Sequence, residues 1–163
     1  MPDTWRGELI EGDLVMAPSP SGRHSLLVAR LHELLLLHLG RGSSVRALVA
    51  PSDVDCDRHN VLQPDLFVLR EEDRLRAPDW RIAVPLWVAE VLSPKTAKYD
   101  RGTKMVVYAR SGVAEAWIVD PRTETVEVRD LLSGARRKLR RGETAESRAL
   151  PGFRVPLDEL FAP

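Results

Sequence analysis

The sequence is poor in cysteine, in long apolar runs and in net charge, and each lack excludes a class of protein. Cys56 is the one cysteine among 163 residues, which excludes an internal disulfide and a zinc site built from several cysteines. No stretch has the roughly 18 consecutive apolar residues of a membrane-spanning helix, and no secretory leader pattern is present. We therefore expect a cytoplasmic protein with no membrane association.

Charge and aromatic content limit how nucleic acid could be bound. Lys plus Arg equal Asp plus Glu at 24 each, so long-range attraction alone would not hold the chain on a polyanion. Any contact with nucleic acid must therefore be local. Aromatic residues make up 6% of the chain and are scattered through apolar runs, so no stacking platform for bases is indicated.

The hydrophobic pattern predicts an N-terminal β-hairpin and two helices. Alternation on both sides of Glu11-Gly12 indicates the hairpin. Leucines at helical spacing predict a helix from about 23 to 39. A second helix is expected from about 96 to 111, with Gly112 as its stop, and 71–81 is expected to be a loop or a short helix.

Apolar or alternating runs of strand length predict strands over 44–56, 61–70, 84–92, 114–120 and 124–131. Pro64 inside the second run implies an edge position or a bulge, whereas 84–92 is apolar enough to be buried on both faces. A final hairpin over 135–150 precedes a closing segment, 155–161. The order is α+β, a mixed central sheet flanked by the two helices with N- and C-terminal hairpins, in one domain spanning residues 1–163.

Two carboxylates lie within apolar runs of strand length. Asp65 is in "QPDLFVL" and Glu90 in "WVAEVLS". Burying an ionised carboxylate costs several kcal/mol unless a partner compensates, and a divalent cation shared by two such groups is one such partner. The alternative is that each acid accepts hydrogen bonds or pairs with an arginine.

Asp100, Lys104 and Tyr108 recur every four residues and so share one face of the second helix. Asp100 and Lys104 are in the favourable order for a helical ion pair worth about 0.3–0.5 kcal/mol, and Tyr108 could simply pack. Because the helix follows the Glu90 strand directly, Lys104 could instead project over the end of that strand. There it would stabilise charge on a transition state or position a water molecule.

Six motifs occur in a fixed order between Gly7 and Phe161: "GELIEGDLVM", "PSPSGRH", "QPDLFVL", "EVLSPKT", "YDRGTKMVVYARSGVAEAWIVDP" and "LPGFRVPLDELF". As a set they resemble the Uma2 family, also called DUF820, of the PD-(D/E)XK restriction-endonuclease-like superfamily. The resemblance implies a restriction-endonuclease-like fold and metal-dependent hydrolysis of phosphodiester bonds in nucleic acid, with DNA as the expected substrate.

The resemblance also implies roles for particular residues. Asp65 and Glu90, with a backbone carbonyl near Val91, would hold Mg²⁺ or Mn²⁺. The usual lysine of the superfamily follows the second acid by two residues, where this chain has Leu92. Lys104 in "DRGTK" matches the place of a lysine moved to the following helix and would offset negative charge on the transition state, with Lys95 and Lys98 as alternatives.

Further residues are expected to support this site. His24 in "SGRH" matches a histidine typical of Uma2-like sequences, and Glu33 is the carboxylate of the first helix, where the superfamily often supplies another acid. Tyr108 shares the face of Lys104. Gln63, two residues before Asp65, could orient water or a ligand, or could be structural.

The concentrated positive charge is a run near the C-terminus: Arg136, Arg137, Lys138, Arg140 and Arg141. Such runs are commonly solvated surface, but this one could contact phosphates if it faced the side of Asp65. Because cutting both strands of a duplex generally requires two active sites, we also expect a symmetric homodimer. The alternatives to a nuclease are an inactive scaffold that binds nucleic acid or a protein, and a small-molecule phosphodiesterase with a closed pocket.

Overall fold

The computed structural model describes residues 7–16, 19–76 and 82–163. Its strands are β1 (Gly7–Ile10), β2 (Asp13–Met16), β3 (Val45–Val49), β4 (Val54–Asp57), β5 (Asn60–Leu62), β6 (Leu66–Arg70), β7 (Trp87–Val91), β8 (Glu115–Asp120), β9 (Thr125–Asp130), β10 (Arg136–Arg140), β11 (Thr144–Glu146) and β12 (Arg154–Pro156). Its helices are α1 (Gly22–Leu39), α2 (Glu71–Arg76), α3 (Ala97–Arg101), α4 (Thr103–Ser111) and α5 (Leu157–Leu160). The stretch expected to be a loop or short helix begins as α2, and its remainder, 77–81, lies outside the described residues.

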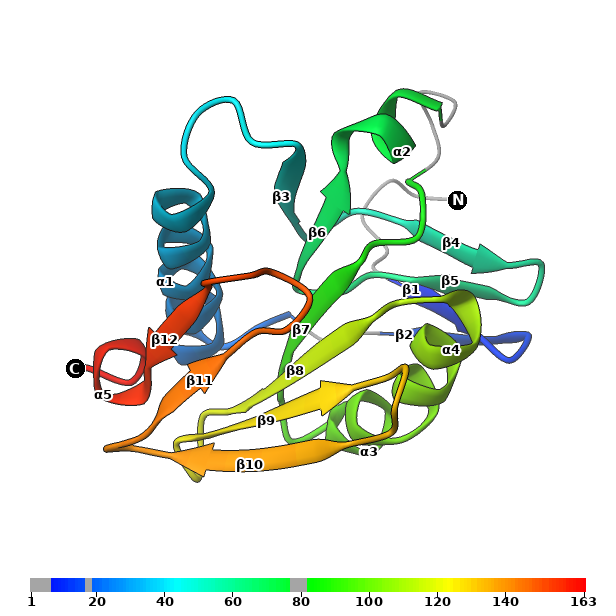
Figure 1. Ribbon diagram of the computed structural model, residues 1–163. Helices are drawn as coiled ribbons and strands as arrows, with labels where there is room; N and C mark the ends of the chain where they lie inside the picture. Colours follow the sequence, from blue (N-terminus) through cyan, green and yellow to red (C-terminus); the bar gives the residue numbers. More distant parts are fainter. Residues whose placement is uncertain (1–6, 17–18, 77–81) are drawn as a thin grey trace.

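A mixed six-stranded sheet of order β10-β9-β8-β7-β6-β3 forms the centre of the fold (Figure 1). β7 and β8 are parallel, and the other neighbours are antiparallel. The chain passes from β7 to β8 through α3 and α4, as a parallel pair requires a crossover connection. The expected α+β class, a mixed sheet flanked by helices, is confirmed.

Helices cover the two faces of this sheet. Leu27, Leu31 and Leu35 of α1 pack with Trp87 and Ala89 on one face. On the other face, α4 packs its apolar side against the alternate residues of the same strands. All five residues of β7 are buried, as its apolar run predicts. None of the described helices is both long and apolar enough to cross a membrane.

The N-terminal hairpin forms as predicted, with β1 and β2 antiparallel around Glu11 and Gly12. Both turn residues have positive φ, 52° and 89°, which is the requirement of a type I′ hairpin turn. β1 also pairs with β5, so the hairpin belongs to a second sheet of order β2-β1-β5-β4 that packs beside the central one.

Two expected strands each divide between the two sheets. The run 61–70 forms β5 and β6, and the run 44–56 forms β3 and β4. Pro64 and Pro51 fall between the halves, because proline has no N–H for a ladder hydrogen bond and the chain leaves one sheet there. As a result, Asp65 lies just before β6 and not within a strand.

The second predicted helix is broken at Gly102 into α3 and α4. A Cβ atom at Gly102 would lie 2.9 Å from the carbonyl oxygen of Lys98, so only glycine allows this close approach. The break tilts the face that carries Lys104 relative to α3 without ending the helical segment.

The predicted final hairpin over 135–150 is wrong in its pairing. β10 pairs with β9 at the edge of the central sheet, and β11 pairs with β12 in a separate two-stranded sheet. The second pairing buries Ala145 and Val155 in the core beside α1. β11 therefore pairs with β12, which buries these side chains, although the connection from β10 to β11 is shorter.

A buried acid ties the C-terminal segment to the central sheet. Glu115 of β8, 1% exposed, accepts hydrogen bonds from the indoles of Trp87 (3.2 Å) and Trp117 (2.7 Å). Its other oxygen accepts from the backbone N–H groups of Arg148 (2.7 Å) and Ala149 (3.3 Å). Four donors compensate the desolvation of this carboxylate, so its role is structural.

Candidate active site

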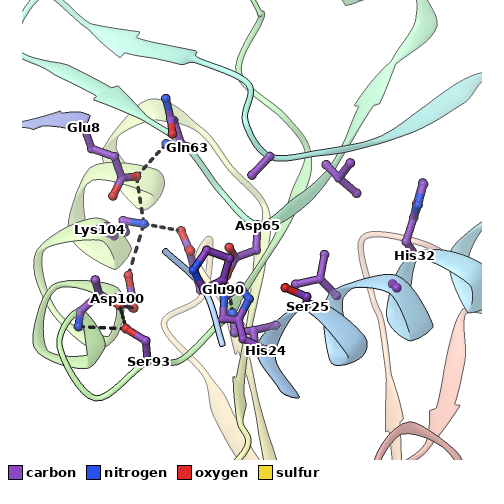
Figure 2. Close-up of a pocket in the computed structure, with 17 residues that line it drawn as sticks. Glu8, His24, Ser25, His32, Gln63, Asp65, Glu90, Ser93, Asp100 and Lys104 are labelled. Carbon is purple, nitrogen blue, oxygen red and sulfur yellow. Dashed lines mark hydrogen bonds and ion pairs between the residues drawn. The ribbon is translucent and has the colours of Figure 1, made fainter. Parts of the chain in front are cut away.

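A cavity of about 400 Å³ opens where β7 ends and β6 begins, between the start of α1 and the α3–α4 segment (Figure 2). Its walls carry four carboxylates, Glu8, Asp65, Glu90 and Asp100, together with Lys104. Each of the four acids comes from a different segment of the fold. The cavity is therefore assembled by tertiary structure and not by one motif.

Asp65 and Glu90 are brought opposite each other by strand pairing. The β6–β7 register pairs Leu66 with Ala89, and one further step along both strands joins Asp65 to Glu90. Asp65 Oδ2 accepts hydrogen bonds from the backbone N–H of Val91 (2.8 Å) and from His24 Nε2 (3.1 Å). Glu90 lies within β7 as expected, whereas Asp65 directly precedes β6 and is opposite Glu90 only by extension of the register.

Lys104 lies at the centre of the acids. Its Nζ atom is 2.9 Å from Glu8 Oε1, 3.1 Å from Glu90 Oε1 and 3.2 Å from Asp100 Oδ1, and its side chain is 5% exposed. An ammonium group has three donors, so all of them are engaged. Tyr108 OH donates a further hydrogen bond of 2.6 Å to Glu90 Oε1.

Burial and charge together shift the pKa values of this group. Burial raises the pKa of Glu90 well above its ordinary value, although the nearby charge of Lys104 acts in the opposite direction. Burial lowers the pKa of Lys104, but attraction to Glu90, Glu8 and Asp100 outweighs it and the pKa is raised. Burial, with the nearby negative charges of Glu90 and Glu8, also raises the pKa of Tyr108. The lysine is therefore held charged and the phenol neutral.

His24 responds to the same acids from the first turn of α1. Burial alone would lower its pKa, but the hydrogen bond and charge of Asp65 and the charge of Asp100 raise it. Its other ring nitrogen, Nδ1, is the one buried side-chain nitrogen or oxygen of the described residues that lacks a hydrogen-bond partner. A buried polar atom without a partner is rare in folded proteins.

Glu8 and Asp100 were not identified as site residues from the sequence. In β1, Glu8 points to the same buried face as Ile10, two residues later. A charged residue at an inward position of an alternating strand is unusual, so the sequence did indicate that Glu8 has a special role. Asp100 was considered only as the helical ion-pair partner of Lys104, a contact that the structure contains at 3.2 Å. It is 3% exposed, and its second oxygen accepts a 2.6 Å hydrogen bond from Thr96 Oγ1.

The other predicted residues divide into those that reach the cavity and those that do not. His24 and Gln63 line it, although the Gln63 side chain donates to Asp53 Oδ1 (2.7 Å). Glu33 does not reach the cavity, because it lies on the exposed side of α1. Lys95 and Lys98 are exposed and outside the cavity, which leaves Lys104 as its lysine.

The basic run lies on the outer edge of the central sheet and does not line the cavity. Leu92, at the position where the resemblance led us to look for a lysine, is 7% exposed and packs in the core beneath α4. A charged side chain at this position would therefore be buried among apolar groups.

In the described part of the chain, no group of three or more His, Cys, Asp and Glu side chains is arranged to hold a metal ion. Within the described residues, Asp65 makes its side-chain hydrogen bonds through Oδ2, and Glu90 makes its own through Oε1. Asp65 Oδ1 and Glu90 Oε2 therefore remain for another partner. A cation at these two acids would take its other ligands from the main chain and from water.

The fold agrees with a solved nuclease-like structure. A crystal structure described as a "putative nuclease belonging to DUF820", from Anabaena variabilis, matches with a TM-score of 0.82 over 96% of this chain and 89% of that chain. The two sequences are 20% identical, so the match establishes the shared α+β fold alone.

The sequence then specifies the family. The model of the Uma2 family, described as "Putative restriction endonuclease", matches residues 1–158, and the chain belongs to this family. Two relatives from Synechocystis sp., "Uncharacterized protein slr1290" and "Uncharacterized protein sll1609", are 31% and 29% identical over 69% and 64% of this chain. The matched parts are 58% and 60% of those proteins, so this chain spans well under two thirds of their length.

The ion cluster predicts a specific pattern of stability. Lys104→Met leaves three buried carboxylates without their shared counter-charge, and we expect it to lower the free energy of unfolding by about 3–5 kcal/mol. Tyr108→Phe removes one hydrogen bond to a charged group and should cost about 1.5–3 kcal/mol. Urea unfolding followed by circular dichroism measures both.

A double variant distinguishes the loss of the Lys104–Glu90 interaction from the loss of packing that each substitution causes by itself. In Lys104→Met with Glu90→Gln, one buried charge is removed together with its partner, so part of the loss should be recovered. If Glu90→Gln adds its full individual effect to that of Lys104→Met, the two groups are not coupled and the interpretation of the cluster is wrong.

Proposed function

We propose that the cavity binds a divalent cation, Mg²⁺ or Mn²⁺, and hydrolyses phosphodiester bonds in nucleic acid, with DNA as the substrate. The observation that carries this proposal is the excess of acid, because four carboxylates face Lys104 and His24. A phosphodiester is itself an anion, and such a cavity would repel it unless a cation lay between them. Membership of the Uma2 family, whose printed description is "Putative restriction endonuclease", supports the same reaction.

Asp65, Glu90 and the main chain at Val91 are the groups that would hold the cation. Mg²⁺ takes oxygen ligands, is commonly held by one or two carboxylates and keeps several waters, which fits a pair of acids with one unengaged oxygen each. When bound, the cation lowers the pKa of a coordinated water and offsets charge on the phosphate.

The surrounding residues position these acids. His24 and the Val91 N–H hold Asp65 Oδ2, and Tyr108 and Lys104 hold Glu90 Oε1. We propose that the main role of Lys104 is to offset the negative charge of Glu8, Glu90 and Asp100, and not that of the substrate. It could donate to a phosphate oxygen only by exchanging one of its three carboxylate partners, because it has no unengaged donor.

We further propose that β10 contributes to binding the nucleic-acid backbone. By the strand register, Lys138 is in line with Glu127, Ile118 and Glu90, so it lies on the sheet face to which the Glu90 side chain belongs. Arg136 and Arg140 share this face, and Arg137 lies on the opposite one. Arg141 pairs with Glu124 (3.2 Å) and Asp158 (3.3 Å), so its charge is partly offset.

Removing either acid should abolish cleavage. We expect Asp65→Asn and Glu90→Gln each to lower metal-dependent cleavage of single-stranded and plasmid DNA by at least ~100-fold, because an interaction worth several kcal/mol in the transition state is lost. Glu72→Gln, an exposed acid of α2, is the matched control. Full activity of Asp65→Asn in a pure preparation would refute the proposal.

The strand register predicts which basic residues of β10 bind phosphate. In the metal-free protein, Ala in place of Arg136, Lys138 or Arg140 should reduce the slope of log affinity against log salt by about 0.7 for single strands and 0.9 for duplexes. Arg137→Ala should leave the slope nearly unchanged. Fluorescence anisotropy across a salt series measures the slopes, and an effect of Arg137 equal to that of Lys138 would contradict the assignment.

One observation favours a second candidate, a nuclease-like scaffold that binds nucleic acid without cutting it. All three donors of Lys104 are engaged by carboxylates, and Leu92 occupies the usual lysine position. In this case nucleic-acid binding by the Asp65→Asn, Glu90→Gln double variant would equal that of the wild type, and the pure wild-type protein would show no cleavage.

For a duplex substrate the proposal includes a symmetric homodimer, because one cavity acts on one strand. Sedimentation at high protein concentration distinguishes a dimer from a monomer, and a monomer that still makes double-strand breaks in one event would contradict this part.

A further inference from the structure

The cavity has a second half that the acid cluster does not use. Beyond Asp65 its walls are formed by α1 and by the end of β3, with Ser25, Val28, Ala29 and His32 on one side and Val49 and Ala50 on the other. In Figure 2, the acids and Lys104 lie on one side and Ser25 and His32 line the other. The two halves adjoin directly, since the Ala50 N–H donates to the Asp65 carbonyl (3.1 Å).

This second half is shaped for a neutral, largely apolar group. Its α1 residues are spaced 25, 28, 29 and 32, so they form one face of the helix. Val28 and Val49 also pack against the buried core, which makes these walls firm. Neither wall carries an acidic residue, a lysine or an arginine among the described residues that line it.

His32 is the polar group at the far end. Burial lowers the pKa of His32, so the ring is neutral at physiological pH and offers one donor and one acceptor. Its ring makes no hydrogen bond recorded for the described part of the chain. Ser25, at the other end of the same helix face, is exposed to the cavity and carries a hydroxyl.

We infer that this half is a nucleoside subsite, which holds the base next to the phosphodiester that lies at Asp65 and Glu90. The inference rests on the proposed function and adds a substrate requirement to it. The whole cavity, acid half included, has about 400 Å³, which falls within the range of small-molecule sites, roughly 300–1,000 Å³. A base that enters such a pocket leaves its stacked position, so the nucleotide is unpaired, in a single strand or turned out of a duplex.

Cleavage kinetics test the subsite. On a single-stranded oligonucleotide, replacing the nucleoside beside the cut with an abasic deoxyribose should lower kcat/KM about tenfold or more, because the contacts of the base with the apolar walls and with His32 are lost. Ser25→Trp fills the half-cavity and should lower kcat/KM on the normal oligonucleotide similarly, while the abasic penalty largely disappears. Leu26→Trp, the adjacent exposed position outside the cavity, should behave like the wild type.

His32→Ala should raise KM for some bases more than for others, whereas Leu37→Ala on the exposed side of α1 should change none of them. Equal cleavage of the normal and abasic oligonucleotides by the wild type would overturn the subsite. Unchanged kinetics of Ser25→Trp would overturn it as well.

A binding experiment keeps the two proposals apart. With Mg²⁺ present, a deoxynucleoside 5′-monophosphate should bind at least about tenfold more tightly than deoxyribose 5-phosphate, and Ser25→Trp should abolish the difference. Equal affinity of the two probes, or no binding of either, overturns the subsite. Base-dependent binding without cleavage of any oligonucleotide would leave the subsite standing and overturn the proposed reaction.

Discussion

The structure of the site depends on one buried ammonium group. Lys104 joins Glu8 of the N-terminal hairpin, Glu90 of the central strand and Asp100 of α3, and the hairpin is far from the other two segments in the sequence. Breaking a buried ion pair leaves an unpaired charge and is strongly destabilising, so each acid depends on the lysine. Asp100 and Lys104 reach this point from two short helices that meet at Gly102.

Because the lysine is fully engaged, the cavity as a whole keeps negative charge. Two consequences follow for function. An anionic substrate would enter only with a cation, which connects the acids to metal-assisted chemistry. The attraction for the rest of a nucleic-acid strand would come from outside the cavity, where Arg136, Lys138 and Arg140 line one face of the edge strand. In this account, catalysis and long-range attraction are assigned to different parts of the same sheet.

Much of the fold could be predicted because it follows from local pattern. The apolar run around Glu90, the leucine spacing of α1 and the turn at Glu11-Gly12 each specify an element. The proximity of Asp65 and Glu90 could also be predicted, because each acid belongs to one of two apolar runs that form neighbouring strands. The alternation in β1 indicated that Glu8 points inward, but its partner Lys104 could not be predicted, because that contact depends on β1 pairing with β5, a distant segment. The partner of β10 was mistaken for the same reason.

The central claim is that Asp65 and Glu90 form a cation site, and the most direct measurement is a calorimetric titration of Mn²⁺ and Mg²⁺ into the wild type and into Asp65→Asn. The account predicts saturable binding with about one ion per chain, which is lost in Asp65→Asn even though that protein remains folded. Binding of equal strength in both proteins, or no binding to the wild type with nucleic acid present, would contradict it.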